Sequence, residues 1–207
     1  HWMGTDAFGR DLYSRVIYGA RVSLQVSFFA IAIGSTTGLL LGVVSGYFSG
    51  WFDNLVQRSV EVMLAFPAIV LAMTLMAVLG GEGLENTIIA MTIVFIPGTL
   101  RTIRGRVLSI KQNVYVDAAR AIGAGHIRIM FRHILPNVIA PYLIIATTLL
   151  GAAILLEATL SFLGLGVPPP YASWGRMLSG AAQKYALCAP WMSLFPGLAI
   201  LCVVFAM

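Results

Sequence analysis

The sequence predicts an all-α protein that crosses a membrane several times as a bundle of helices. Of its 207 residues, 59% are hydrophobic and only 10% are charged, whereas soluble domains carry about 25% charged residues. The apolar residues gather into long uncharged stretches, and about 20 such residues are enough for one helix to cross a bilayer. All 13 Lys and Arg residues lie outside those stretches. This is the pattern of a polytopic membrane protein.

Five apolar stretches are predicted to span the membrane within a single transmembrane domain, 1–207. They cover residues 24–44, 62–79, 86–100, 138–156 and 190–207. The polar segment 1–21 precedes the first stretch, and Leu12–Arg21 has the spacing of a short amphipathic helix at the membrane surface.

Glycines recur at every fourth position in the first predicted span, at Gly34, Gly38 and Gly42. Small residues at this spacing let two helices approach closely in lipid. The sequence therefore predicts a close helix contact along this face. The alternative is that these glycines are incidental to an apolar helix.

Positive charge predicts which side of the membrane each loop faces. The segment 101–136 contains seven basic residues, Arg101, Arg104, Arg106, Lys111, Arg120, Arg128 and Arg132. The loop after the second predicted span contains none, and the loop 164–189 contains two. Because cytoplasmic loops carry the excess of Lys and Arg, we expect 101–136 to be cytoplasmic and 164–189 to be extracytoplasmic. Segment 1–21 is then extracytoplasmic, although its three arginines count against this.

Both ends of the sequence predict that the chain is a fragment. It begins at His1 without an initiator methionine and ends at Met207 within an apolar run. An extracytoplasmic N-terminal segment also requires an earlier span to bring it across the membrane. We therefore expect a chain that lacks its first span and its C-terminus, with five spans present of six.

The basic segment Val116–Asn137 has a pattern that indicates a docking element for another protein. Its residues predict an Ala-rich helix from Asp117, a break at Gly123, and a second helix from His126 to His133. An ordinary basic loop that only fixes topology is the alternative, but such a loop needs neither an Ala pair nor two helices.

The ends of this helix pair are also predicted from local chemistry. Small side chains at Ala118 and Ala119 would let the groove of a partner protein close over the first helix. The pair Leu135-Pro136 is expected to end the second helix, because proline disfavours helical conformation in the residue before it.

This segment resembles the EAA loop of permease subunits of binding-protein-dependent ABC importers. The family pattern is E-A-A-x-x-x-G followed by I-x-L-P. The matching residues here are Asp117, Ala118, Ala119, Gly123, Leu135 and Pro136. Asp117 replaces the usual Glu and keeps the carboxylate, and His133 stands where Ile is usual.

Four further segments resemble one branch of this family, the second permease of oligopeptide, dipeptide and nickel importers. They are Gly4–Arg15, Tyr18–Leu24, Glu157–Val167 and Ser173–Leu178. Together with the EAA loop, they extend the resemblance over essentially the whole chain.

The resemblance implies a transmembrane bundle of the type I ABC importer permease kind, in the plasma (inner) membrane of a bacterium or archaeon. Such a subunit forms half of a pathway for peptides; nickel, glutathione or oligosaccharides are alternative substrates. The implied partners are a second permease in a heterodimer, cytoplasmic ABC ATPase subunits and an extracytoplasmic solute-binding protein. The ATPase-coupling residues would be Asp117, Ala118, Ala119, Gly123 and His133, with Leu135 and Pro136 leading back to the membrane.

The sequence contains no motif for catalysis of its own. It has no G-x-x-x-x-G-K-[ST], so ATP binding by a P-loop is not expected. The three histidines have no metal-ligand spacing, Cys188 and Cys202 are expected to be free, and no cofactor or nucleic-acid partner is expected. A stand-alone channel or secondary transporter, or a passive membrane anchor, are alternative functions. Uncharged span interiors count against the first, and Gly- and Pro-interrupted spans count against the second.

Glu157 is the acidic residue in a predicted spanning region, at its outer end. An ionisable group in a membrane is a functional hypothesis by default. Two roles remain open. Glu157 could contact a peptide amine or water in the pathway, because we expect water to reach it there, or it could hold the loop between Pro168 and Trp174 in place.

Overall fold

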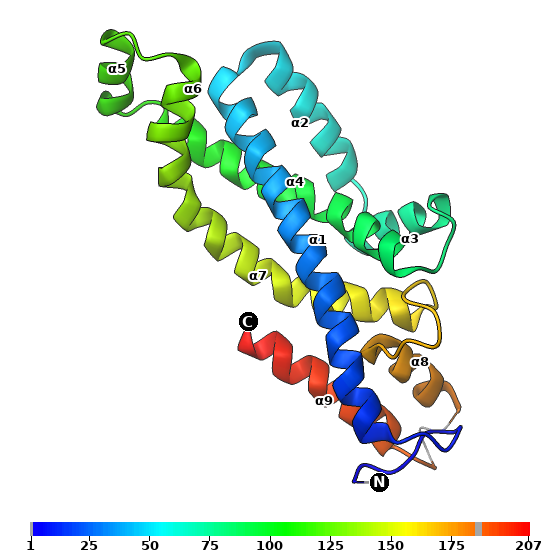
Figure 1. Ribbon diagram of the computed structural model, residues 1–207. Helices are drawn as coiled ribbons and strands as arrows, with labels where there is room; N and C mark the ends of the chain where they lie inside the picture. The colour runs from blue at the N-terminus through cyan, green and yellow to red at the C-terminus, as the bar shows by residue number, and fades with distance from the viewer. Residues whose placement is uncertain (1, 185–187) are drawn as a thin grey trace.

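The computed structural model describes residues 2–184 and 188–207, and all regular elements in these ranges are helices. They are α1 (Leu12–Phe48), α2 (Gly50–Leu64), α3 (Ala68–Val78), α4 (Leu84–Ile110), α5 (Val114–Ala121), α6 (His126–Ile129), the π-helical turn η1 (Met130–Ile134), α7 (Leu135–Phe162), α8 (Trp174–Lys184) and α9 (Trp191–Ala206). Figure 1 shows an elongated bundle with α1 along its length. Helices α5 and α6 lie at one end, and α8 and the N-terminus lie at the other.

Helix α1 is one continuous helix of 37 residues. The prediction of a separate surface helix, Leu12–Arg21, before a span at 24–44 is therefore wrong. No proline interrupts the sequence, and Asp11 starts the helix by accepting a hydrogen bond from the Ser14 amide at 2.8 Å. At 1.5 Å per residue the helix is about 55 Å long, which exceeds the roughly 30 Å hydrocarbon core of a bilayer.

The second predicted span, 62–79, is not a straight helix. Helices α2 and α3 meet at an angle of 97°. The break falls at Pro67, which has extended backbone angles of φ −54° and ψ 135°. Proline has no N–H to donate to the preceding turn and disfavours helix in the residue before it, which explains why the chain bends there.

Within the described part of the chain, three helical stretches are long and apolar enough to cross a membrane alone: α1, α4 and the continuous run His126–Phe162. The bent α2–α3 pair would be a fourth, whereas α9, with 16 residues, is shorter. The predicted spans 86–100 and 138–156 lie inside longer helices. The fifth span, 190–207, stays a prediction.

The chain does not leave the helical state at Leu135-Pro136, so this expected helix end is wrong. Instead, the Leu135 amide donates to the Met130 carbonyl, a π-helical i→i+5 bond that widens the turn Met130–Ile134. A wider turn is one way to place a proline within a helix, because Pro136 cannot donate and its ring crowds the preceding turn. Helix α7 then continues beyond it to Phe162.

The most extensive contact between two described helices is that of α1 with α4. A Cβ added at Gly34 would lie 2.7 Å from the Thr92 carbonyl oxygen, and one at Gly42 would lie 2.8 Å from the Leu100 carbonyl oxygen. Gly38 lies equally close to α4, and the series continues to Gly46. The predicted close contact along this glycine stripe is confirmed, because the backbones meet where a side chain would stand.

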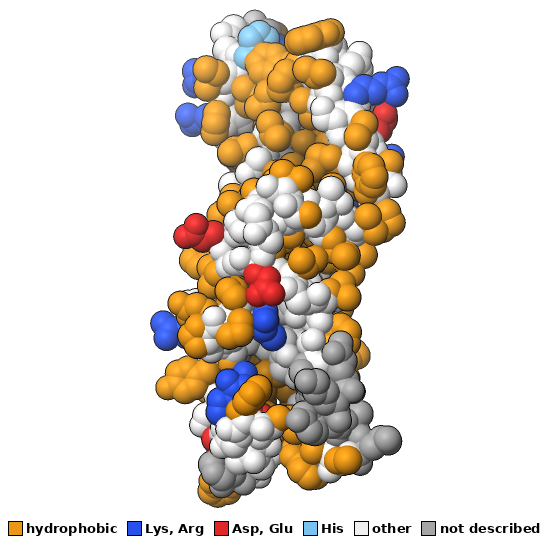
Figure 2. Space-filling model, turned by 90° about the vertical axis from the view of Figure 1, so that its right-hand side faces the viewer, with side chains coloured by type: hydrophobic (Ala, Val, Ile, Leu, Met, Phe, Trp, Pro, Cys, Tyr) orange, Lys and Arg blue, Asp and Glu red, His pale blue; other side chains and the backbone are white. Residues whose placement is uncertain are grey.

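Hydrophobic side chains also cover much of the outside of the bundle. Figure 2 shows them along most of one face, with Lys and Arg side chains toward the two ends. The exposed set includes Phe28, Ile33 and Leu40 of α1 and Leu143 and Ile144 of α7. A surface of this kind is suited to lipid or to the apolar face of another subunit.

Replacement of Gly38 by alanine should destabilise the bundle. Its new Cβ would lie 2.9 Å from both the Ile96 carbonyl oxygen and the Thr99 Cβ, and overpacking of this kind costs about 1–3 kcal/mol. Thermal unfolding in detergent measures the effect. Gly98→Ala on α4 is the matched control, because no atom lies within 4 Å of its added Cβ. Equal unfolding temperatures for the two variants would contradict the importance of the stripe.

Candidate functional site

Helix α5 and the glycine after it form the centre of the predicted docking element. The helix ends in a Schellman motif: the Ala124 amide donates to the Ala119 carbonyl at 3.0 Å, and the Gly123 amide donates to the Arg120 carbonyl at 2.9 Å. Gly123 has a φ of +82°, a conformation that side-chain-bearing residues adopt only with strain. This turn directs the chain from α5 into α6.

The two faces of α5 have different environments. Val116 and Ala119 are buried in a hydrophobic cluster with residues of α1, α4 and η1. Asp117 and Ala118 face outward, and Asp117 makes a surface ion pair with Arg120 at 3.1 Å. The predicted coupling residues are therefore divided: Ala119 anchors the helix, whereas Asp117 and Ala118 are available to a partner.

Large apolar side chains are exposed around α5, although the sequence reasoning did not single them out. Val114 is 84% exposed, Ile122 is 86% exposed and Ile127 is 70% exposed. They lie at the start of α5, at its end and at the start of α6. Exposed apolar residues grouped at the tip of an otherwise basic segment are typical of a surface that a partner covers.

The remaining predicted coupling residues follow α6, in the π-helical turn and at the start of α7. His133 is half-buried in the π-helical turn, with its ring 6.4 Å from that of Tyr115, and its carbonyl accepts a hydrogen bond from Asn137 at 2.6 Å. Leu135 is half-buried and packs on the cluster that holds α5, whereas Pro136 is exposed. The structure thus brings Leu135 together with Ala119 but leaves Pro136 at the surface.

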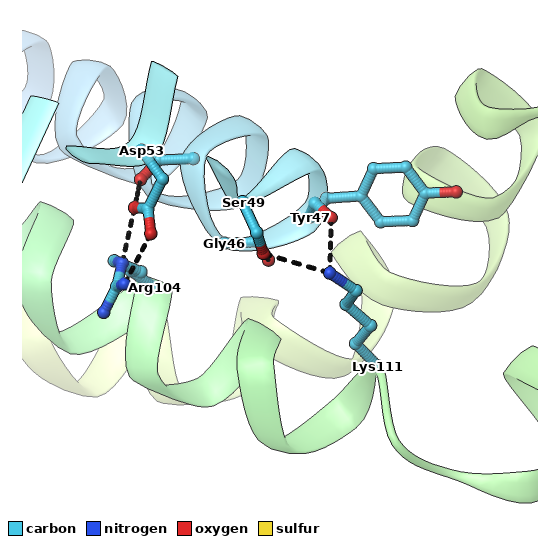
Figure 3. Close-up of polar contacts among 7 residues, drawn as sticks. Gly46, Tyr47, Ser49, Asp53, Arg104 and Lys111 are labelled. Carbon is cyan, nitrogen blue, oxygen red and sulfur yellow. Dashed lines mark hydrogen bonds and ion pairs between the residues drawn. The ribbon is translucent and has the colours of Figure 1, made fainter. Parts of the chain in front are cut away.

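A polar network fastens the α1–α2 turn to α4 at the same end of the bundle (Figure 3). Arg104 makes a bidentate pair with Asp53, with Nε donating to Oδ1 at 2.6 Å and a terminal nitrogen donating to Oδ2 at 2.5 Å. Asp53 also accepts from Ser45 and is only 4% exposed. Paired, hydrogen-bonded charges of this kind are costly to break because a single charge would be left buried.

The sequence reasoning missed this network. It counted Arg104 and Lys111 only among the basic residues that indicate topology. The partners are far apart in sequence, so no local pattern shows the pairing. The one available signal is an isolated acidic residue, Asp53, directly after an uncharged span.

Glu157 is completely buried, so the expectation that water reaches it is wrong. Ser161 of the same helix donates to its Oε1 at 2.7 Å. The buried side chains of Ser23 and Ser173 lie close to the carboxyl group, whose Oε2 makes no hydrogen bond among the described residues. Ser23 lies on α1 and Ser173 directly precedes α8. The surroundings therefore favour the structural role, in which Glu157 holds the segment before Trp174 against α1 and α7.

Other contacts fasten the same segment at the end of the bundle opposite α5. The Trp174 indole donates to the Val16 carbonyl at 2.9 Å. Arg176 pairs with Glu82 at 3.0 Å, which joins α8 to the turn between α3 and α4. Three elements that are distant in sequence thus meet around α8. Cys188 and Cys202 are free, as expected.

The family of the chain follows from comparison with known proteins. The family model described as the binding-protein-dependent transport system inner membrane component matches residues 38–207. The chain belongs to this family. The match includes α5, the Schellman turn and Glu157, so the resemblance drawn from the EAA loop is confirmed.

The curated relatives that the chain matches are also permease proteins of transport systems. The chain is 47% identical over 204 residues to a dipeptide transport system permease protein DppC of Alkalihalophilus pseudofirmus, covering 99% of this chain and 66% of the relative. It is 40% identical over 206 residues to a glutathione transport system permease protein GsiD of Pectobacterium atrosepticum, covering 100% of this chain and 68% of the relative. A putative peptide transport system permease protein of Brucella suis is 46% identical over 200 residues, with 97% and 67% covered. The chain thus spans about two thirds of the length of these relatives.

A solved structure supports the fold. The MetNI methionine ABC transporter in an inward-facing conformation matches with a TM-score of 0.78 at 18% identity, covering 93% of this chain and 90% of the matched chain. The predicted all-α permease fold is therefore confirmed. The chain is a multi-pass membrane protein of the permease kind.

Replacement of Glu157 by alanine should destabilise the protein by about 2–4 kcal/mol, because it opens a cavity and leaves the buried Ser161 hydroxyl without its acceptor. Glu157→Gln should cost less, since its amide oxygen can still accept from Ser161. Thermal unfolding of the two variants in detergent measures the difference. An alanine variant as stable as the parent protein would contradict the structural role.

Proposed function

We propose that the chain is the transmembrane permease subunit of an ABC importer for peptides, and that it forms half of the translocation pathway. The observation that carries this proposal is the α5–α6 unit, whose outward face presents Asp117, Ala118 and exposed apolar residues at one end of a membrane bundle. A short helix with one anchored and one free face is suited to insertion into a groove of an ATPase. The similarity to dipeptide and peptide permeases supports the substrate class.

The proposed partners follow from this arrangement. A second permease covers the exposed apolar surface of the bundle as a heterodimer, and cytoplasmic ATPase subunits bind α5 and α6. An extracytoplasmic solute-binding protein delivers the substrate at the end where α8 lies. In this proposal the chain is not catalytic, ATP is hydrolysed by its partners, and the complex resides in a bacterial inner membrane.

Each coupling residue has a distinct role in the proposal. Asp117 and Ala118 contact the ATPase directly, while Ala119 holds α5 on the bundle. Gly123 sets the angle at which the chain returns into α6. His133, Leu135 and Pro136 connect this unit to α7; an exposed basic surface around them suits an acidic partner face.

Import of glutathione is a second candidate function, because glutathione permeases are among the similar proteins. Glutathione is itself a short peptide with free carboxylates, so one pathway could suit both solutes. Competition distinguishes them: for a dipeptide importer, excess unlabelled dipeptide suppresses uptake of labelled dipeptide and excess glutathione does not. The reverse pattern would identify a glutathione importer.

The proposal is tested with the full-length subunit assembled with its partner permease, ATPases and binding protein in vesicles. We expect uptake of labelled dipeptide that requires both ATP on the ATPase side and the binding protein on the other side. Uptake that continues without ATP would instead indicate a channel or a secondary transporter.

Replacement of Gly123 by valine should abolish this uptake while the subunit still inserts in the membrane. At a φ of +82° a β-branched side chain is strained, so the turn that orients α5 would be lost. Gly125→Val is the matched control, because its φ of −68° and ψ of 157° suit valine and no atom lies within 4 Å of the added Cβ. Normal uptake by the Gly123 variant would contradict the docking role.

A further inference from the structure

Tyr47 lies in the last turn of α1 and is only 4% exposed. It makes polar contacts through two different atoms. Its hydroxyl is 2.8 Å from Nδ1 of His126, and its carbonyl accepts a hydrogen bond from Nζ of Lys111 at 2.8 Å. Figure 3 shows the Lys111 side chain reaching up to the Tyr47 carbonyl and to Ser49.

These two partners bracket the α5 helix in the sequence. Lys111 follows the last residue of α4 and precedes α5, whereas His126 is the first residue of α6. Lys111 thus lies before and His126 after the segment that contains α5 and the Gly123 turn. Both ends of this segment are attached to the same residue of α1, Tyr47.

The contact with Lys111 is favourable for a physical reason that is specific to a helix end. The last carbonyls of a helix have no partner within the helix and carry partial negative charge. Helix α1 ends at Phe48 because Ser49 has a φ of +56°. The ammonium group of Lys111 therefore caps α1 from outside, and its second contact, 3.1 Å to Ser49 Oγ, holds it there.

The contact with His126 is covered on the Tyr47 side, which is buried, whereas the His126 side chain itself is exposed. The Tyr47 and Phe48 rings both lie against the imidazole of His126, with centroids 5.7 Å and 5.9 Å from it. The Tyr47 side chain also belongs to the hydrophobic cluster that includes Val116 and Ala119 of α5. A hydrogen bond in such partly dry surroundings is stronger than one in water, and a missing partner is more costly.

Helix α1 is in turn fixed to α4 along the glycine stripe, and Ser45 of α1 donates to Asp53 of α2, which pairs with Arg104 of α4. Lys111 and His126 thus attach the chain on both sides of α5 to Tyr47. From Tyr47, α1 runs to the opposite end of the bundle, where Trp174 donates to the Val16 carbonyl.

We propose that Tyr47 is the positioning residue through which movement of α5 is passed to α1, with His126 and Lys111 as its two attachment points. The inference rests on the proposed function, since the force on α5 comes from a bound ATPase. It adds to that function a specific mechanical route through α1, in addition to the covalent connections of α5 to α4 and α7.

The attachment itself can be tested without transport, by distance measurements between spin labels at Asn113, directly before α5, and Trp51, which are both exposed. Cys188 and Cys202 are replaced by alanine beforehand, and the complex is otherwise complete. Tyr47→Phe removes only the hydroxyl and keeps the ring. The population in which α5 is detached from α1 should then rise about threefold to tenfold, which corresponds to the loss of one hydrogen bond.

Two substitutions of His126 separate the hydrogen bond from general disruption. His126→Asn keeps a polar atom near the position of Nδ1, whereas His126→Gln places its amide near the position of Nε2, away from the Tyr47 hydroxyl. We expect Asn to retain the narrow distance distribution and Gln to broaden it as Tyr47→Phe does. Tyr18→Phe, which removes an exposed hydroxyl at the other end of α1, is the matched control.

The functional consequence is measured as the number of peptides imported per ATP hydrolysed by the reconstituted complex. We expect this ratio to fall about threefold to tenfold in Tyr47→Phe and His126→Gln, with ATP hydrolysis maintained, and to be retained in His126→Asn and Tyr18→Phe. A merely structural role would lower uptake and hydrolysis together and leave the ratio unchanged, which would overturn the inference.

The same measurements distinguish failure of the inference from failure of the proposed function. A parent complex without ATP-dependent uptake would refute the proposed function, and the spin-label distances would still decide whether Tyr47 fastens α5. Unchanged distances in Tyr47→Phe would overturn the inference whether or not the complex transports peptides.

Discussion

The close approach of α1 to α4 is the contact on which the rest of the structure depends. Gly34, Gly38 and Gly42 bring the α1 backbone against carbonyl groups of α4. In lipid no hydrophobic effect drives two apolar helices together, so packing at short range supplies the attraction. Because a close-packed interface has a fixed geometry, it also sets where the ends of both helices lie. The positions of Tyr47 and Lys111 follow from it.

The two ends of α1 are fastened in different ways. At the α5 end, the Asp53–Arg104 pair and the cap from Lys111 hold the α1–α2 turn to α4. At the other end, the Trp174 indole donates to the Val16 carbonyl and the Trp174 amide donates to Ser23 Oγ, which holds the start of α8 against α1. Helix α1 thus contacts both the region proposed to bind the ATPase and the region proposed to meet the binding protein.

Two errors in the sequence predictions, the straight span 62–79 and the helix end at Leu135-Pro136, have one cause. The effect of a proline on a helix depends on its surroundings. Pro67 ends a helix and the chain turns by 97°, whereas Pro136 is accommodated by a π-helical turn and the helix continues to Phe162. Both follow the same local chemistry, the missing N–H and the crowded preceding turn. Which outcome occurs depends on tertiary packing, here on the cluster that buries Met130 and Ile134.

The sequence by itself determined the all-α membrane fold, the close glycine contact of α1 and the position of the α5–Gly123–α6 unit, because these depend on composition and on local spacing. It did not determine that Glu157 is buried, or that Ala119 faces inward while Asp117 faces outward. It also did not show that Tyr47 contacts Lys111 before α5 and His126 after it. Those features require side chains distant in the sequence to meet, and only the packing of the helices decides which ones do.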